Sequence, residues 1–134
     1  MCTGMVTLSP TSVAIVCNVR DPLELTCNST GSFIRWSMIV GSEEGVPQEY
    51  SRSITSEDGS QQVSMIELNS TTFTFMRTSS QRMLPLVSTL VIESVNRYLN
   101  GTEVHCSDVA TTITASTTIH LFDDGIFGVY DNTP

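Results

Sequence analysis

Apolar and polar residues alternate with a period of two along most of this chain. Between residues 23 and 27, Leu23, Leu25 and Cys27 share one face while Glu24 and Thr26 take the other. This pattern predicts a β-strand with one buried side. The alternation recurs in later segments, whose inward positions are Ile34, Trp36 and Met38; Leu86, Ser88, Leu90 and Ile92; Val104 and Cys106; and Ile113, Ala115, Thr117, Ile119 and Leu121.

Turn-forming residues separate these segments, and no segment has a helical period. Gly, Pro, Asn and Asp gather at Ser9-Pro10, Asp21-Pro22, Gly45 to Pro47, Asp58-Gly59 and Asn100-Gly101, where they favour tight turns. Short strands joined in this way predict an all-β fold. We expect a β-sandwich of two antiparallel sheets with seven to nine strands in total.

The length of 134 residues suits one domain, since a chain of this size buries about two thirds of its unfolded surface. We predict a single domain over residues 1–122 and an acidic tail or inter-module linker over residues 123–134. Asp123, Asp124 and Asp131 could supply calcium ligands at a module junction. We favour the linker interpretation of these residues.

The charge balance limits the classes of partner. Fourteen acidic residues stand against six arginines and no lysine, which gives a net charge of -8. Nucleic acids and anionic membrane surfaces attract clustered Lys and Arg, so we expect neither as a partner. No run reaches the roughly 18 apolar residues of a membrane span, and the start lacks the pattern of a signal peptide. We expect an ectodomain fragment, joined to a membrane only through segments outside this sequence.

Three N-glycosylation sequons begin at Asn28, Asn69 and Asn100. The four cysteines form no CxxC pair or Cys/His cluster that would suit zinc. Sequons together with an even number of cysteines favour an oxidising, secretory compartment. We therefore expect an extracellular or cell-surface glycoprotein.

The stretch LELTCNSTGSFIRWS from residue 23 and the later stretch STLVIESVNRYLNGTEVHC resemble the immunoglobulin superfamily. The resemblance implies that the β-sandwich is immunoglobulin-like, with an inter-sheet disulfide between Cys27 and Cys106 packed against the indole of Trp36. The alternation adds Leu25, Leu90 and Ile92 to the same core.

The long separation of Cys27 and Cys106 leaves room for extra strands, as in a variable-like module. Glu49 to Ile54, Val63 to Leu68 and Thr72 to Thr78 are predicted as strands C′, C″ and D. Val104 replaces the usual corner tyrosine, and the gap from Cys27 to Trp36 is short. With SPTSVAIVC and LNGTEVHCSD, the chain looks more like the tandem immunoglobulin-like ectodomain modules of sponges and other invertebrates than like a vertebrate antigen receptor.

Cys2 and Cys17 are the remaining pair. If residues 5–16 form one continuous strand, the pair cannot bond, since each residue adds about 3.3 Å and the Cα atoms must approach within about 7 Å. If residues 9–12 make a tight turn, Cys2 returns opposite Cys17. We favour this closed disulfide, and the alternatives are a bond to a neighbouring module and a thiol that links two copies.

The candidates for catalysis are few. His105 and His120 lie on outward strand faces, and Asp108 follows His105. A triad also needs a serine nucleophile on a strained turn, and no GxSxG or comparable motif is present. We therefore expect no enzymatic activity, no metal site and no cofactor, and we interpret both histidines as solvated surface residues.

Protein recognition is the function class that remains. Variable-type modules present the sheet of strands G, F, C, C′ and C″ to another protein, and glycans at Asn28 and Asn100 would leave that face open. The outward residues predicted for it are Arg35, Ser37, Glu49, Arg52, Glu103 and His105.

The expected function is a non-enzymatic recognition module of a cell-surface receptor or adhesion molecule, which engages a protein ligand or a second copy of itself. The alternative is a structural spacer in a tandem array, flanked by neighbouring immunoglobulin modules. Self-association is compatible with adhesion, whereas a spacer does not require it.

Cys27→Ala or Trp36→Ala is expected to lower the free energy of unfolding by roughly 2–5 kcal/mol. The first change removes a cross-link and the second opens a large cavity in the core. Thermal melting of the two variants measures the loss. A variant that keeps the parental melting temperature contradicts the core assignment.

Overall fold

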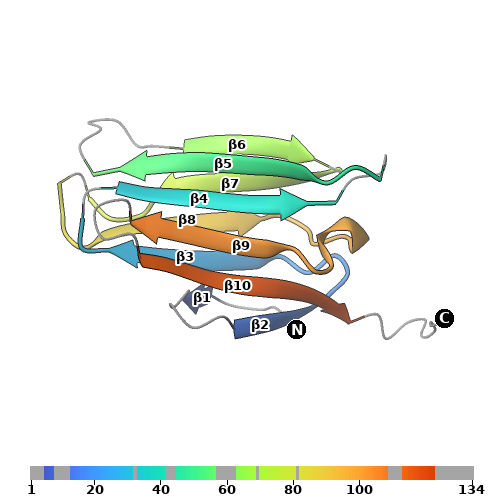
Figure 1. Cartoon of the computed structure of the whole chain (residues 1–134). Helices are drawn as coiled ribbons and strands as arrows, with labels where there is room; N and C mark the ends of the chain where they lie inside the picture. Colours follow the sequence, from blue (N-terminus) through green and yellow to red (C-terminus); the bar gives the residue numbers. More distant parts are fainter. Residues whose placement is uncertain are drawn as a thin grey trace.

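A computed structural model describes residues 5–7, 13–31, 33–41, 45–56, 63–68, 70–80, 82–108 and 113–122. They form an immunoglobulin-like sandwich of two β-sheets, which confirms the predicted fold class (Figure 1). The strands are β1 (Met5–Thr7), β2 (Val13–Asn18), β3 (Leu23–Ser29), β4 (Phe33–Val40), β5 (Gln48–Thr55), β6 (Val63–Leu68), β7 (Thr71–Arg77), β8 (Leu86–Ile92), β9 (Glu103–Asp108) and β10 (Ile113–Phe122). A single turn of 3-10 helix, η1 (Arg97–Leu99), precedes β9. Within the described residues, no helix has the length and apolar character needed to cross a bilayer.

Each sheet contains five strands. Sheet I has the order β1, β3, β8, β7, β6, and sheet II has the order β2, β10, β9, β4, β5. Neighbouring strands are antiparallel except at one edge of each sheet, where β1 pairs with β3 and β2 pairs with β10 in parallel. The predicted C′ segment is β5, which pairs with β4 in sheet II.

The N-terminal part of the chain contributes one edge strand to each sheet, β1 to sheet I and β2 to sheet II. β1 runs parallel to β3 and β2 runs parallel to β10, while β3 and β10 point in opposite directions (Figure 1). β1 and β2 therefore run in opposite directions, as the closed Cys2 to Cys17 pair requires. Cys17 is disulfide-bonded and buried, and Cys2 lies outside the described residues, so their pairing stays a prediction.

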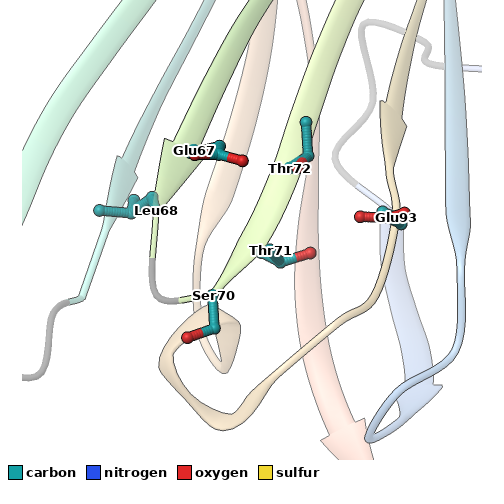
Figure 2. Close-up of a pocket in the computed structure, with 6 residues that line it drawn as sticks. All are labelled: Glu67, Leu68, Ser70, Thr71, Thr72 and Glu93. Carbon is teal, nitrogen blue, oxygen red and sulfur yellow. The ribbon is translucent and has the colours of Figure 1, made fainter.

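The prediction that residues 63–68 form strand C″ of the same sheet as C′ is wrong. Strand β6 pairs instead with β7, the predicted D strand, in sheet I. Leu68 pairs with Thr71, so only two residues join the strands, and the second of them, Ser70, has a φ of 65° (Figure 2). A two-residue hairpin turn with positive φ makes consecutive strands direct neighbours. The short turn therefore places β6 beside β7 in sheet I.

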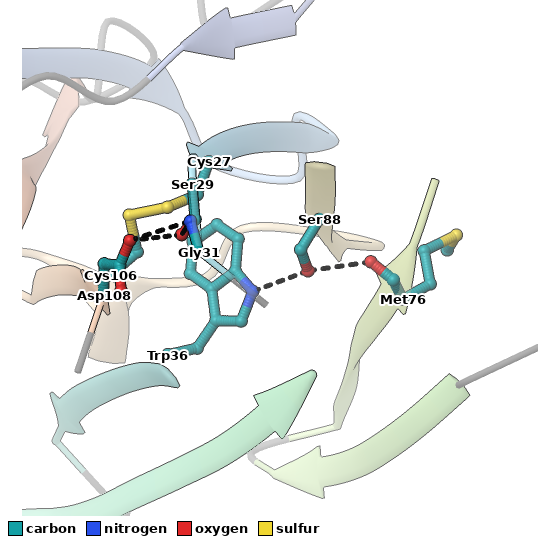
Figure 3. Close-up of a disulfide and its surroundings, with 8 residues drawn as sticks. All are labelled: Cys27, Ser29, Gly31, Trp36, Met76, Ser88, Cys106 and Asp108. Atoms are coloured by element: carbon teal, nitrogen blue, oxygen red, sulfur yellow. Dashed lines mark hydrogen bonds between the residues drawn. A yellow bond between two sulfur atoms is a disulfide. The ribbon is translucent and has the colours of Figure 1, made fainter. Parts of the chain in front are cut away.

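A disulfide and an indole join the two sheets at the centre of the sandwich (Figure 3). Cys27 of β3 is bonded to Cys106 of β9, with their Cα atoms 6.5 Å apart, so the implied inter-sheet disulfide is confirmed. Trp36 is fully buried, and its ring lies 6.2 Å from that of Phe75, centroid to centroid. Leu25, Leu90 and Ile92, which the alternation placed in the core, are also fully buried.

The indole N–H of Trp36 is satisfied from the opposite sheet. Nε1 donates to Oγ of Ser88 at 2.8 Å, and Ser88 in turn donates to the carbonyl oxygen of Met76 at 2.8 Å (Figure 3). Ser88 is itself fully buried. Because a buried N–H without an acceptor costs about 1–3 kcal/mol, this serine is the residue that allows a tryptophan to occupy the centre of the core.

The corner between β8 and β9 is held without the tyrosine of the immunoglobulin pattern. Val104 packs in the core at 1% exposure, and the side-chain oxygen of Asn96 caps η1 by accepting from the backbone N–H of Tyr98 at 3.0 Å. Asn100 Oδ1 accepts from the backbone N–H of Leu121 at 3.1 Å. Side chains of asparagine thus fix the corner to β10.

Ser88→Ala is expected to lower the free energy of unfolding by about 1–3 kcal/mol, because it leaves the indole N–H of Trp36 buried without an acceptor. In the Trp36→Phe background the same change should cost less, since no buried donor is then left unpaired. Urea unfolding followed by far-UV circular dichroism gives all four corners of this cycle. Equal costs of Ser88→Ala in both backgrounds would show that the hydrogen bond contributes nothing.

Candidate functional site

The outer surface of sheet II carries most of the residues predicted for recognition. In β4 the buried Trp36 and Met38 alternate with Arg35, Ser37 and Ile39, which point outward. Strand pairing places Ser51 and His105 on either side of Ser37. We define the β4–β5–β9 face by its outward side chains, which are Arg35, Ser37, Ile39, Glu49, Ser51, Ser53, Glu103, His105 and Ser107.

A hollow of about 250 Å³ opens on this face. Ser37 is smaller than the neighbouring Ile39 and His105, so the surface dips between them. Ile39, which is 57% exposed, adds an apolar wall. The lining residues are Ser37, Met38, Ile39, Glu49, Glu103 and His105. Four of the residues predicted for the partner face are therefore brought together around one depression.

Two carboxylates give the hollow its charge. Glu103 Oε1 lies 3.1 Å from Nε2 of His105, and the two side chains are 61% and 37% exposed. Glu49 approaches from β5, opposite Ile39 in the ladder, and it has no hydrogen bond or ion pair with any residue that the structure describes. Carboxylates beside an exposed apolar side chain suit the end of a basic side chain, which packs its stem and pairs its head group.

Arg35 lies at the other end of the face. Its cross-strand neighbours are Ser53 on β5 and Ser107 on β9, so this exposed guanidinium stands between two small side chains. Across the described ranges it forms no hydrogen bond or ion pair. The face therefore has a projecting cation at one end and an acidic hollow at the other.

Arg52 does not belong to this face, contrary to the prediction. It pairs with the inward Trp36, whereas Glu49 pairs with the outward Ile39. Residues three apart on a strand point to opposite sides, so Glu49 and Arg52 cannot share a face. Arg52 Nε instead donates to Oγ of Ser64 on β6 at 2.9 Å, across the gap between the two sheets.

A second arginine also links sheet I to β5. Arg77 of β7 is only 8% exposed, and its Nη1 donates to the carbonyl oxygen of Thr55 on β5 at 3.4 Å. Arg52 reaches from sheet II to sheet I, and Arg77 reaches from sheet I to sheet II. Both side chains therefore hold the edge strand β5 against sheet I, Arg52 through β6 and Arg77 through β7.

The sequons lie away from the β4–β5–β9 face. Asn28 is exposed on β3 of sheet I, where it pairs with Val87. Asn100 is exposed at the β8–β9 corner, with its Oδ1 bonded to Leu121. Asn69 lies outside the described residues, between Leu68 and Ser70. Glycans on Asn28 and Asn100 would therefore leave the face uncovered.

A second hollow, of about 350 Å³, lies beside the β6–β7 turn (Figure 2). Its lining residues are Glu67, Leu68, Ser70, Thr71, Thr72 and Glu93. Glu67 and Glu93 are the only carboxylates among them, and no three metal-ligating side chains gather anywhere in the described part of the chain. A glycan on Asn69 would extend from the same turn, so this hollow is the weaker candidate for binding.

His105, His120 and Asp108 lie apart and do not form a catalytic cluster. Asp108 points to the core side of β9, opposite to His105, and accepts hydrogen bonds from Oγ of Ser29 at 2.5 Å and from the backbone N–H of Gly31 at 3.3 Å. This carboxylate therefore holds the connection that leads from β3 to β4. His120 is exposed near the opposite edge of the sheet, paired with Val16 of β2.

Ile39 and Met38 were missing from the residues predicted for the site. Met38 was assigned to the core, where it is buried, but it also lines the hollow. Ile39 had a visible signal: an apolar residue directly after the inward Met38 breaks the alternation of β4 and marks an exposed apolar side chain.

Comparison of the chain with protein-family models and with curated proteins finds no match. What the protein binds must therefore be inferred from the geometry of the β4–β5–β9 face.

Arg52→Ala is expected to lower the free energy of unfolding by about 1 kcal/mol or more, because it removes both the bond to Ser64 and the packing of the side-chain stem. Arg35→Ala, on the same sheet but with no side-chain partner in the described ranges, should stay within about 0.5 kcal/mol of the wild type. Urea unfolding of the two variants makes the comparison. Equal changes in the free energy of unfolding would show that Arg52 does not stabilise the fold more than a solvated surface arginine does.

Proposed function

We propose that this chain is an extracellular protein-recognition module of a cell-surface receptor or adhesion molecule, and that it binds through the β4–β5–β9 face. The observation that carries the proposal is the hollow in which Glu49, Glu103 and Ile39 meet. Glu49 has no ion-pair partner among the described residues, Ile39 is 57% exposed, and no sequon lies on the face.

The chemistry of the hollow indicates what part of a partner it takes. A guanidinium or ammonium group would pair with the two carboxylates, and its alkyl stem would pack on Ile39. Small serines around the hollow allow a protein surface to approach closely. We therefore propose a protein partner that presents a basic side chain.

Other features of the chain support the proposed compartment and family. Sequons, the Cys27 to Cys106 cross-link and a second bonded cysteine, Cys17, fit an oxidising environment. The sandwich with its disulfide and tryptophan supports placement in the immunoglobulin superfamily, and the resemblance to invertebrate ectodomain modules belongs to the same proposal. With β6 in sheet I, the module departs from the variable-type plan at C″.

A glycan added to the face should abolish recognition. Ser51→Asn completes an N-x-Ser sequon with Ser53 at the centre of the face, and Glu24→Asn completes an N-x-Thr sequon with Thr26 on the outer side of sheet I. Tetramerised protein from a secretory host would be tested on cells that each display one ectodomain, this chain included. We expect Ser51→Asn to lower binding at least about tenfold and Glu24→Asn to leave it unchanged, since a glycan blocks only the surface that carries it.

Mass spectrometry must first show that both variants carry the added glycan, and thermal melting must show that both are folded. Loss of binding with Glu24→Asn alone would place recognition on sheet I and contradict the proposal. If the wild type binds none of the displayed ectodomains, the spacer function is favoured.

A further inference from the structure

We propose that the partner of the β4–β5–β9 face is a second copy of this chain, packed face to face so that Arg35 of each copy enters the acidic hollow of the other. This inference rests on the proposed function, because it names the partner of the same face. The proposed dimer has twofold symmetry and a defined register between its two facing sheets.

The face consists of three rows of side chains that cross β4, β5 and β9. Arg35 lies in the first row between Ser53 and Ser107. Ser37 lies in the middle row between Ser51 and His105. Ile39 and Glu49 form the third row, and Glu103 lines the same hollow. Successive rows are two residues apart along the strand, or roughly 6.6 Å.

A twofold axis between two facing sheets, running across the strands along the middle row, reverses the order of the rows. The first row of each copy then faces the third row of the other. Arg35 of one copy is thereby placed over Ile39, Glu49 and Glu103 of the second copy. The same contact forms twice, as in any isologous interface.

The two ends of the face complement each other in charge and in shape. Arg35 projects between small serines, and the hollow is a depression of about 250 Å³ with two carboxylates on its wall. The guanidinium offers donors to both carboxylates while the methylene stem packs on Ile39. Arg35 and Glu49 have no partners among the described residues, so neither must give up an internal bond to form this contact.

The alternative twofold register is disfavoured by charge. An axis parallel to the strands would bring the two first rows together and the two third rows together. Arg35 would then face Arg35, and carboxylates would face carboxylates, an arrangement that repels. Because the chain carries a net charge of -8, association without a specific cation in the interface is also opposed.

Charge reversal tests the register directly. Arg35→Glu and the double variant Glu49→Arg/Glu103→Arg each place like charges at both contacts of their own dimer. Mixed together, they restore an opposite-charge pair at both contacts. Sedimentation equilibrium should show a wild-type dimer, dissociation constants at least about tenfold weaker for each variant alone, and a heterodimer in the equimolar mixture within a few-fold of wild type.

Arg20→Glu is the matched control, because Arg20 is an exposed arginine between β2 and β3 and lies off the face. It makes the same charge change and should leave the dimer unaffected. Unchanged melting temperatures show that the variants are folded. A wild-type monomer at all concentrations, a fully dimeric Arg35→Glu variant, or a mixture that stays monomeric overturns the proposal.

Failure here is distinguishable from failure of the proposed function. If the wild type is monomeric but binds another displayed ectodomain, and Ser51→Asn abolishes that binding, the face still recognises a protein and only the second copy is excluded. If Ser51→Asn leaves all binding intact, both proposals fail.

Discussion

The cross-strand pair of Trp36 and Cys106 is the constraint on which the rest of the molecule depends. These residues face each other in the β4–β9 ladder, and both point into the core, where Cys106 is bonded to Cys27 of the other sheet. Because side chains alternate along a strand, burying this pair forces Ser37 and His105 outward. A slip of one residue would send the indole to the solvent. The register that forms the core therefore also forms the hollow.

Alternation and turn residues were enough to predict the sandwich, the strands that carry Cys27 and Cys106, and the outward positions of Arg35, Ser37, Glu103 and His105. It failed where apolar residues are sparse. In β5 only Tyr50 and Ile54 point inward as apolar markers, and Arg52 lies between them on the same side. Taken as a pair, these two residues would have placed Arg52 correctly. The sheet to which β6 belongs depended on the number of residues in its turn, which the local hydrophobic pattern does not encode.

Polar side chains stabilise two places at which the chain departs from the expected pattern. The corner tyrosine is absent, and η1 together with the side chain of Asn100 binds the corner to β10. Ser88 breaks an apolar run on the inward face of β8, yet it is the acceptor that the indole requires. A polar residue inside an apolar pattern can therefore identify the partner of a buried tryptophan, although only the register of facing sheets shows which residue pairs with it.

The two arginines that link β5 to sheet I also affect how readily the protein adds further strands at high concentration. Strands β5 and β6 each end a sheet among the described strands, and an exposed sheet edge is a template for aggregation. Adding a foreign strand to β5 would disturb the bonds that Arg52 and Arg77 make with sheet I and with β5, and it would bury the charge of Arg52. The sandwich thus discourages open-ended polymerisation along its edges while its broad surface stays free. Many copies can then be present at a high local concentration without forming fibres along these edges.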